Sequence, residues 1–454
     1  MEEMQYKLRD PLQKGDELLD FVFGLQYDDL SQELVEKTKR TILDDISAAC
    51  AGRRTLEKKG RLFERTFPNG EEASIFGTNQ KTDVQSAAFI NACYMQYHDF
   101  TDGFDCSGVY SSSFHPGRVI IPAAMAMAEK MGASGKDLIP AIVAAYEVAA
   151  RIRNPKYIGM SIADAMAVAA ATSKIAGATR EQIKNAMSIA AYFCPVHNLG
   201  MGENAGNIYD VTCIGIGELA RAGVVSTVMA LNGMTGAPFN DDPNYTRRYR
   251  VHGMGEDYYI MHTYFKPWPV CRKTHGAIAC AIRFRNEYHI RPQDIKEVII
   301  YQQNAAMYVD NPVTKNFDYL HRQFSLQYET ACAFFDGTIE FDRLTSDEVA
   351  PDIFDFAQRI RVVGDDSLDG CCETKPNHAA MDIILKDGTV RSLYEPYPLG
   401  AGPNPMTKEQ SIAKLAYAAE NLYSEKEQEN LVAYIDNIEN KDSVDISIKS
   451  LIGR

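Results

Sequence analysis

The pattern of hydrophobic and polar positions divides the chain into three stretches. In the first half, apolar residues recur every three or four positions over long runs, which predicts helices packed against one another. Near residue 260 short runs rich in β-branched residues begin, and these are typical of strands. Helical periodicity returns after residue 407. The pattern therefore predicts a helical part, a mixed part and a second helical part.

The segment 134–152 has the clearest helical pattern of the first half, with Ser134 as a suitable N-cap. A second helix is expected over 118–131, directly after His115-Pro116-Gly117, with Pro122 near its first turn. Further helices are predicted over 161–177, 179–193 and 216–236.

The second half mixes strand and helix signals. The run 295–302 is short and rich in β-branched residues, as is 359–366. The run 381–394 predicts a hairpin that turns at Asp387-Gly388. Helices are expected near 274–288 and 325–335, a Gly/Pro linker over 399–407, and helices again from 408 onward.

The fold class that follows is mainly α with an α+β second domain. At 454 residues the chain exceeds the size at which one hydrophobic core stops growing. We expect a helical domain over 1–262, an α+β domain over 263–398, and helices over 399–454 that pack back on the first domain.

The composition of the chain limits the classes of partner that the protein is expected to bind. The formal net charge of −14 disfavours nucleic acid and anionic membranes, so an acidic substrate would need a local basic pocket. The ten Cys show no zinc-type spacing. The polar start of the chain is no secretory signal, and no uninterrupted apolar run reaches about 18 residues. These features predict a cytoplasmic protein with free thiols and no membrane partner.

The stretch 98–117 is the first candidate for chemistry, because it gathers carboxylates, histidines and hydroxyls. It ends at the start of a predicted helix, where free N–H groups favour an anion. Asp99, Asp102 and His115 are therefore candidates for proton transfer beside a bound carboxylate. A capped turn with solvated carboxylates would give the same pattern. A metal site is a third reading, but the spacing matches no ligand pattern.

The stretch 265–280 is the local basic patch that the net charge requires. Lys266, Arg272, Lys273 and His275 fall within ten residues, and two prolines stiffen the approach. Lys and Arg suit a di- or tricarboxylate, since Arg can hold a carboxylate through two hydrogen bonds. The alternative is an exposed basic turn.

Two single residues are weaker candidates. Tyr328 lies in an otherwise apolar helical run over 322–337, where a buried Tyr needs a partner for its hydroxyl. It is a candidate proton donor, although a core residue would give the same signal. His197 is a candidate for lining a pocket, although a structural histidine is the simpler reading.

Together these stretches resemble the MmgE/PrpD family in order and spacing over most of the chain. The family has a motif like DFDDT followed by HPG, a helix like AEaxGasGkdllxAixxgyEvxxRi, and the motifs KPYPxCRxTH, FSxxY and GxPxNPM. The corresponding residues here are Asp99–Gly103, His115–Gly117, 128–152, Lys266–His275, Phe324–Tyr328 and Gly402–Met406.

The resemblance implies a large all-helical domain formed by both chain ends, a smaller α+β lid domain and a homodimer. Known members include 2-methylcitrate dehydratase, cis-aconitate decarboxylase and iminodisuccinate epimerase, and none of them needs a metal or organic cofactor. Their shared chemistry is proton removal or addition beside a carboxylate, between the helical domain and the lid. Carried over by position, the implied active-site residues are Asp99, His115, Lys266, His275 and Tyr328.

Three departures from the family pattern bear on the reaction. Gly103 stands where the family has threonine. The decarboxylase-like members have a histidine near 157–161 and a lysine near 206–220, and both are missing here. The loss argues against usual handling of citrate-like tricarboxylates, and His197 and Tyr209 are candidates to fill the gap.

We therefore expect a cofactor-independent lyase of dehydratase type that acts on a small di- or tricarboxylic acid. Asp102, Arg272 and Lys273 are the further candidates for substrate binding, beside His197 and Tyr209. An epimerase of the iminodisuccinate type is the first alternative. A decarboxylase, or a carboxylate-binding homologue without catalysis, is the second.

Overall fold

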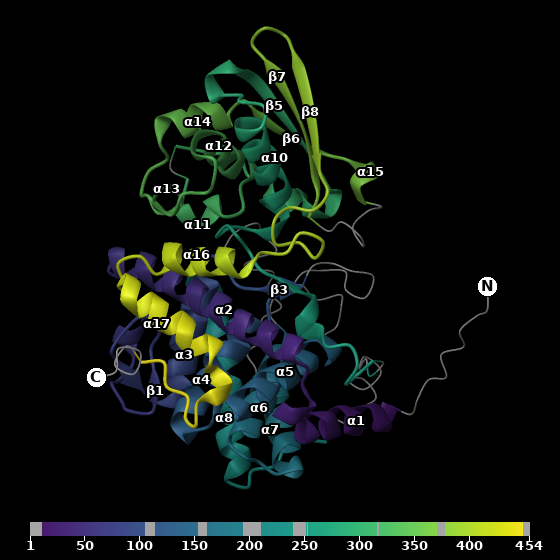
Figure 1. Cartoon of the computed structure of the whole chain (residues 1–454), viewed down its shortest axis with the longest axis vertical. Coiled ribbons are helices and arrows are strands. Elements are labelled where there is room, and N and C mark those ends of the chain that lie inside the picture. The colour runs from purple at the N-terminus through teal and green to yellow at the C-terminus, as the bar shows by residue number, and fades with distance from the viewer. Residues whose placement is uncertain are drawn as a thin grey trace, which may run out of the picture.

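The protein has two lobes, which Figure 1 shows one above the other. The computed structural model describes residues 11–104, 114–152, 161–193, 210–238, 251, 253–315, 317–369 and 377–447. His197, Tyr209 and the middle of the 98–117 stretch lie outside these described residues, as do positions 157–160.

The helical lobe, the lower one in Figure 1, is built mainly from the first half of the chain. Ser161 opens α6 by accepting the N–H of Ala163, and Thr179 opens α7 by accepting the N–H of Gln182. Its helices are α1 (Pro11–Gly24), α2 (Gln32–Lys58), α3 (Val84–Gln96), α4 (Gly117–Met131), α5 (Gly135–Ile152), α6 (Ile162–Ile175), α7 (Arg180–Phe193) and α8 (Asp210–Leu231), and a short pair of strands joins them, β1 (Ala73–Ser74) with β2 (Lys81–Thr82).

Small residues let the central helices pack closely. A Cβ on Gly223 of α8 would lie 2.4 Å from the side chain of Val168 in α6, so only glycine fits there. By length and composition α8 could cross a membrane, and 56% of its most apolar window is buried inside the protein. A core helix of a globular domain passes the same test, and α8 packs against α3, α6 and α7.

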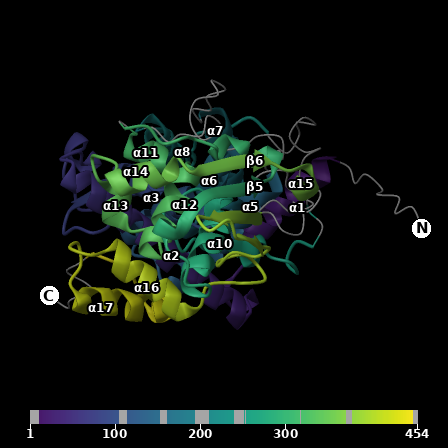
Figure 2. The ribbon, with the colours of Figure 1, turned by 90° about the horizontal axis from the view of Figure 1, so that it is seen from above.

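The C-terminal helices α16 (Lys408–Ala418) and α17 (Glu425–Asp436) lie along α2 of the helical lobe (Figures 1 and 2). The Lys414 ammonium pairs with Asp44 at 2.8 Å, and the Arg54 guanidinium donates to the Tyr417 carbonyl at 3.0 Å. The first and last parts of the chain therefore share one hydrophobic core.

The upper lobe is a four-stranded sheet packed on helices, with strand order β6-β5-β7-β8. β5 and β6 are parallel and the other pairs are antiparallel, with the hairpin turning at Gly388, whose φ is +89°. Its elements are α10 (His275–Asn286), β5 (Ile295–Gln302), α11 (Tyr319–Arg322), α12 (Leu326–Asp336), α13 (Phe341–Thr345), α14 (Pro351–Ala357), β6 (Ile360–Gly364), α15 (Asp366–Asp369), β7 (Ala379–Leu385) and β8 (Val390–Glu395).

Two short strands pair where the chain passes from the helical lobe to the upper lobe. β3 (Gly103–Phe104) follows the Asp99–Asp102 turn, and β4 (Thr263–Tyr264) leads directly to Lys266. They pair antiparallel, with Gly103 opposite Tyr264. This pairing brings two stretches that are far apart in the sequence to one place.

The predicted fold class is confirmed: the protein is mainly helical with a smaller α+β part. The predicted strands and hairpin are observed within two residues of their expected ends. The helix expected over 216–236 instead spans Asp210–Leu231, because the chain turns at Gly233, whose φ is +86°. The domain boundaries stay a prediction.

Candidate active site

The centre of the site is a buried ion pair between the two lobes. The Lys266 ammonium lies 2.8 Å from Asp99 Oδ2, and it also donates to the Asp99 backbone carbonyl. Both side chains are almost fully buried. Asp99 has a φ of +44°, a conformation that a non-glycine residue adopts rarely and that costs energy. The Lys266 contacts to carboxylate and carbonyl hold this turn in place.

His115 lies on the other side of Asp99. Its Nε2 is 3.6 Å from Asp99 Oδ1, and its Nδ1 is 2.7 Å from the backbone carbonyl oxygen of Asp102. A carbonyl oxygen only accepts hydrogen bonds, so Nδ1 carries a proton. In the neutral ring Nε2 is then the nitrogen with the lone pair, and it faces the Asp99 side. His115 is therefore set up to accept a proton.

Gly103 explains how the His115 ring fits beside the turn. A Cβ at this position would lie 2.6 Å from His115 Nδ1 and 2.8 Å from the Tyr264 hydroxyl. No side chain can be accommodated there without moving the ring. The glycine found where the resemblance leads one to expect threonine is thus a requirement of this packing.

Arg272 and His275 form the second half of the site, at the start of α10. Arg272 Nη1 lies 3.0 Å from His275 Nδ1 and donates to the Leu399 carbonyl at 3.1 Å. The His275 ring packs edge-on against Trp268, with ring centroids 5.1 Å apart. Both Arg272 and His275 are buried.

The proton of His275 sits on the opposite nitrogen from that of His115. A guanidinium only donates, so His275 Nδ1 accepts from Arg272 and Nε2 carries the proton of the neutral ring. Burial lowers the pKa of His275 well below its usual range, and the Arg272 and Lys266 charges lower it further. A backbone hydrogen bond of the ring with Val270 acts in the opposite direction. His275 is therefore a neutral donor.

Tyr264 is a site residue that the sequence patterns missed. Its ring lies under the Arg272 guanidinium at 4.5 Å and edge-on to the His115 ring at 6.2 Å. It precedes Lys266 by two positions at the end of an extended segment, so both side chains point to the same face. That period-two spacing was the available signal.

Glu329 is a second missed residue. It lies on α12 with no exposed surface. Burial raises the pKa of Glu329 well above its usual range, and the nearby Asp99 charge raises it further. Thr274 and Lys266 act in the opposite direction. A buried carboxyl group with a raised pKa thus lies within electrostatic reach of the Asp99–Lys266 pair.

Asp102 points away from this site, into the helical lobe. Its Oδ2 accepts from the Tyr146 hydroxyl at 3.0 Å, and the N–H of Gly117 also donates to its carboxyl. The start of α4, where we expected a substrate carboxylate, is therefore occupied by a carboxyl group of the chain itself. Asp102 contributes only its backbone carbonyl to the site, where this oxygen accepts a hydrogen bond from His115 Nδ1.

The other predicted site residues lie less close to the Asp99–Lys266 pair. The Tyr328 hydroxyl donates to the Arg343 carbonyl at 2.8 Å, within the upper lobe, which we call the lid. No described contact brings Tyr328 to the Asp99–Lys266 pair. Lys273 is half-buried, and its carbonyl accepts from Gln302. His197 and Tyr209 lie outside the described residues, so their predicted roles stay predictions.

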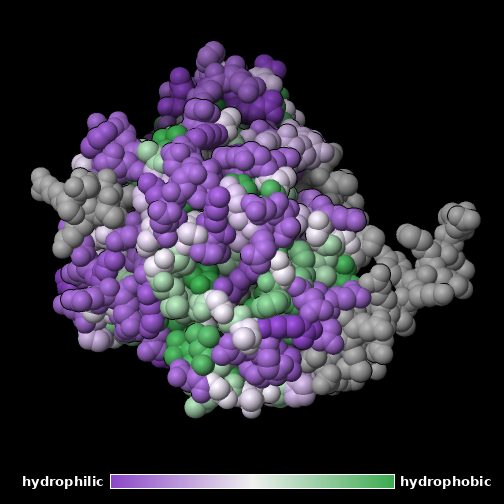
Figure 3. Space-filling view, turned by 60° about the horizontal axis from the view of Figure 1, so that its bottom comes forward, coloured by the Kyte–Doolittle hydropathy of each residue, from purple (hydrophilic) through white to green (hydrophobic). Residues whose placement is uncertain are grey.

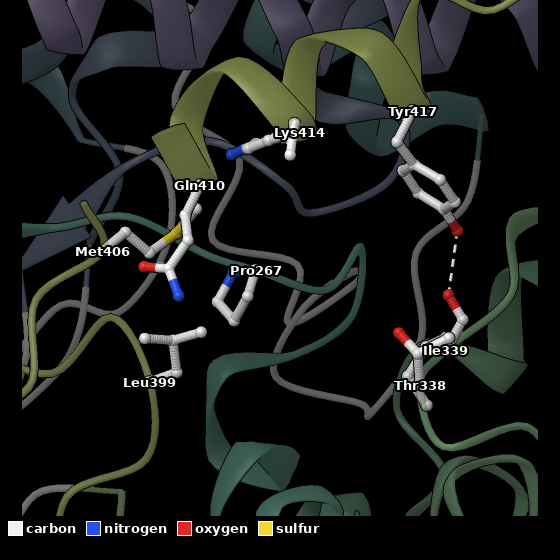
Figure 4. Close-up of a pocket in the computed structure, with 9 residues that line it drawn as sticks. Pro267, Thr338, Ile339, Leu399, Met406, Gln410, Lys414 and Tyr417 are labelled. Atoms are coloured by element: carbon white, nitrogen blue, oxygen red, sulfur yellow. Dashed lines mark hydrogen bonds between the residues drawn. The ribbon is translucent and has the colours of Figure 1, made fainter. Parts of the chain in front are cut away.

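A pocket of about 210 Å³ lies next to the site, between α16 and the lid (Figure 4). Pro267, the residue after Lys266, forms part of its wall, and Lys414 and Tyr417 of α16 form another part. The Tyr417 hydroxyl closes one end by donating to the Ile339 carbonyl at 2.8 Å. Within the described ranges no group of three His, Cys, Asp or Glu side chains has the arrangement of a metal site.

Comparison with known protein families establishes the family to which the chain belongs. The MmgE/PrpD N-terminal domain matches residues 16–241, and the MmgE/PrpD C-terminal domain matches residues 268–440. The chain belongs to the MmgE/PrpD family. The two matched regions meet at the junction that carries Lys266, so the candidate site of this MmgE/PrpD protein draws on both family domains.

Curated relatives of this MmgE/PrpD protein are full-length matches at low identity. Cis-aconitate decarboxylase of Mus musculus is 21% identical, with 95% of this chain and 92% of that protein covered. Cis-aconitate decarboxylase of Aspergillus terreus is 23% identical, with 93% of each chain covered. That of Homo sapiens is 21% identical over 95% of this chain and 93% of its own length. The relatives are enzymes, but identity this low does not fix one reaction.

Proposed function

We propose that this protein is a cofactor-independent lyase of dehydratase type, which removes a proton beside a carboxylate of a small di- or tricarboxylic acid. The observation that carries the proposal is the pair of histidines in opposite tautomers. His115 presents a lone pair on Nε2, and His275 presents an N–H on the same atom. One base and one donor, both beside buried cations, are what the reaction requires.

In the proposed reaction His115 Nε2 takes the proton from the carbon next to the substrate carboxylate. The Asp99 carboxylate at 3.6 Å stabilises the imidazolium that forms. Lys266 balances the charge of Asp99, so the aspartate stays ionised and does not compete for the proton. His115, the proposed base, and Asp99, the carboxylate beside it, thus form a fixed pair.

The electron pair left by the proton spreads onto the substrate carboxylate. Arg272 and Lys266 supply the positive charge that stabilises it, in surroundings that exclude water and strengthen the attraction. His275 Nε2–H adds a neutral hydrogen bond to the growing charge. A neutral donor suits this role, because it stabilises an oxyanion without giving up its proton.

The leaving hydroxyl needs a proton to depart as water. We assign this proton to Glu329, because burial raises the pKa of its carboxyl and the Asp99 and Lys266 charges act on it. The hydroxyl of Tyr328, the predicted proton donor, instead donates a hydrogen bond to the Arg343 carbonyl. One proton leaves the α-carbon, one joins the hydroxyl, and the C–O bond pair leaves with water.

Decarboxylation is the second candidate, and the curated relatives favour it because they carry the name cis-aconitate decarboxylase. It would use the same cations, with the C–C bond to a carboxylate breaking in place of the C–O bond. The histidine and lysine that decarboxylase-like members have near 157–161 and 206–220 are absent here. Dehydration therefore remains our first proposal.

Proton NMR in D₂O separates these reactions. We would incubate the chelator-treated protein with cis-aconitate and a panel of hydroxy, amino and unsaturated di- and tricarboxylates. Loss of the α-proton signal with a new alkene signal is the expected result. Loss of that signal without an alkene would indicate epimerisation, and release of CO₂ would indicate decarboxylation. No exchange with any acid would count against α-proton chemistry on this class of substrate.

We also propose that the protein works as a homodimer in the cytoplasm. In support of the dimer, large apolar side chains are exposed on the helical lobe, and Figure 3 shows apolar patches on the face that it presents. Sedimentation of the wild type beside Val228→Glu, which adds charge to this face, would test it. The exposed residues on α7, α8 and the turn that follows are Tyr192, Phe193, Val211, Ile214, Val228 and Met234.

A further inference from the structure

Three carboxyl groups are buried together in the helical lobe, behind the turn that carries Asp99. Asp44 and Asp45 are neighbours on α2, and Asp102 ends the turn before β3. None of the three has exposed surface. A buried carboxylate needs a cation or several donors, because transfer of its charge out of water is costly.

Asp44 meets this requirement with a lysine. The Lys414 ammonium of α16 lies 2.8 Å from its Oδ1 and also donates to the Phe100 carbonyl at 2.7 Å. Lys414 is itself buried, so the pair is a fixed part of the packing between α2 and α16. Burial still raises the pKa of Asp44, while the charge and hydrogen bond of Lys414 act in the opposite direction.

Asp45 and Asp102 meet instead at the backbone of Gly117. The point that a Cβ on Gly117 would occupy lies 1.9 Å from Asp45 Oδ2 and 2.4 Å from Asp102 Oδ1. The two oxygens are therefore no further apart than the sum of these two distances. Asp45 Oδ1 accepts the backbone N–H of Asp102 at 3.2 Å, which holds the two residues face to face.

Among the described residues no cation touches this pair, although Lys414 acts on Asp45 and Lys37 on Asp102 from a longer distance. Neither carboxyl makes an ion pair, and the amine of Lys37, the cation that acts on Asp102, donates to the Thr263 carbonyl at 2.7 Å. The Tyr146 hydroxyl gives Asp102 one neutral hydrogen bond. Two carboxylates this close cannot both stay ionised in a dry site. The titratable and charged groups that face the pair are Lys37, Arg40, Asp44, His115, Tyr146 and Lys414.

We propose that Asp45 and Asp102 share one proton, and that this acid pair is the positioning device that holds the Asp102 carbonyl against His115. That carbonyl accepts from His115 Nδ1 at 2.7 Å and so sets the ring's tautomer. The role toward His115 rests on the proposed function, in which His115 is the base. The shared proton itself does not, since it follows from the burial and the contacts of the two carboxyls.

The acidities of the groups agree with this arrangement. Burial raises the pKa of Asp102 to about 7, and the nearby Asp44 charge contributes. Burial raises the pKa of Asp45 well above its usual value, with Asp102 the next cause. A carboxyl with a raised pKa adds stability that is fully present below its unfolded value of 3.8. That stability is lost as the pH rises through the folded pKa.

The test is Asp45→Asn, whose amide imitates a protonated carboxyl in size and hydrogen bonding. We would measure the free energy of unfolding by denaturant at several pH values between 4 and 8. The wild type should lose stability with rising pH, and the variant should show a slope smaller by the equivalent of up to one proton. An unchanged slope would overturn the shared proton.

Asp44→Asn is the matched control on the same helix. Because Asp44 has Lys414 as partner, the amide leaves a buried ammonium without its counter-charge. The control should therefore be less stable than the wild type over the whole pH range. At pH 5, Asp45→Asn should instead unfold at the same denaturant concentration as the wild type. Equal destabilisation of both variants at pH 5 would show that Asp45 is charged, and would overturn the proposal.

A kinetic measurement tests the positioning role with the substrate that the NMR panel identifies. In the wild type, kcat/KM should fall above about pH 7, where the pair loses its proton and the two charges repel. Asp45→Asn should move this alkaline limb upward by about one pH unit or more. A variant with a lower rate but an unmoved limb would overturn the positioning role. If no acid is turned over, the proposed function fails while the unfolding slopes still decide the shared proton.

Discussion

Two buried clusters of ionisable side chains flank the Asp99–Asp102 turn, and they reach opposite solutions. The junction cluster joins both lobes and has cations in direct contact with its ionised carboxylate. The α2 cluster lies within the helical lobe and α16, and it has more carboxyls than ammonium groups. The junction cluster is Asp99, His115, Lys266, Arg272, His275 and Glu329; the α2 cluster is Lys37, Asp44, Asp45, Asp102, Tyr146 and Lys414.

The difference shows that burial alone does not decide whether an acid is charged. Asp99 has the Lys266 ammonium at 2.8 Å, whereas burial raises the pKa of Asp102 to about 7 and the hydrogen bonds from Tyr146 and Gly117 offset this only in part. The junction cluster therefore keeps positive charge, which we propose serves an acidic substrate. The α2 cluster holds protons and, we propose, fixes the geometry of the turn.

Lys266→Ala should disturb the junction cluster most. Turnover should fall by about 10³-fold or more, because the charge that stabilises the developing carbanion is lost. The variant also leaves Asp99 as a buried carboxylate without its cation, which costs about 3–5 kcal/mol of stability. Steady-state kinetics and denaturant unfolding would measure the two effects separately.

A double variant separates chemistry from folding at this position. Lys266→Ala with Asp99→Asn removes both charges, so it should regain most of the lost stability and none of the turnover. The exposed Lys296, replaced by Ala, is the control for loss of a lysine from the lid. A fully active Lys266→Ala variant would remove this lysine from the mechanism.

Gly103→Ala tests the position of His115 without removing any charge. The new Cβ would lie 2.6 Å from His115 Nδ1, so the ring must move. A displacement of this kind should lower kcat by about 10²-fold. Gly402→Ala is the control, because no heavy atom of its surroundings lies within 4 Å of that Cβ. Equal rates for the two variants would mean that the His115 position is not critical.

Glu329→Gln tests the buried acid in the lid. The amide keeps the shape but cannot release a proton, so kcat should fall by about 10- to 100-fold while the fold persists. With its folded pKa raised above the ordinary 4.5, Glu329 adds stability below that pH, and this stability is lost as the pH rises through the folded pKa.

The variant should therefore lose less stability than the wild type between pH 5 and 8, as measured by denaturant unfolding at each pH. Glu297→Gln, on the partly exposed strand β5, is the matched control. If kcat is unchanged in Glu329→Gln, the leaving hydroxyl takes its proton elsewhere.

Tyr328→Phe should have the smallest effect. It removes the hydrogen bond from the phenol to the Arg343 carbonyl and should cost about 1 kcal/mol of stability. Turnover should change less than about threefold, because the hydroxyl is engaged inside the lid. A loss of 10²-fold or more would return the proton-donor role to Tyr328 and take it from Glu329.

Much of this fold could be predicted from local signals. Ser161 and Thr179 each accept a backbone N–H at the start of a helix, and Gly388 supplies the positive φ of the hairpin turn. Such features depend on neighbours a few residues away, so the sequence reveals them. The Lys266–His275 stretch could likewise be identified as a basic patch, since an acidic chain has few of them.

Contacts between distant residues could not be predicted in this way. Asp45 lies on a helix that no pattern singled out, and only the packing of α2 beside α4 brings it to Asp102. Tyr264 faces His115 only because β3 pairs with β4. Polar groups inside an apolar helix look alike in the sequence whether they are structural or functional.

The pair Tyr328 and Glu329 shows where the division lies. By itself the sequence determined that both residues lie on one helix, and that their side chains point about 100° apart because a turn holds 3.6 residues. Only the tertiary structure decided that Tyr328 faces Arg343 while Glu329 lies within reach of Asp99 and Lys266. The physical reason is that helix rotation is set by packing against the rest of the lid, and not by the helix itself.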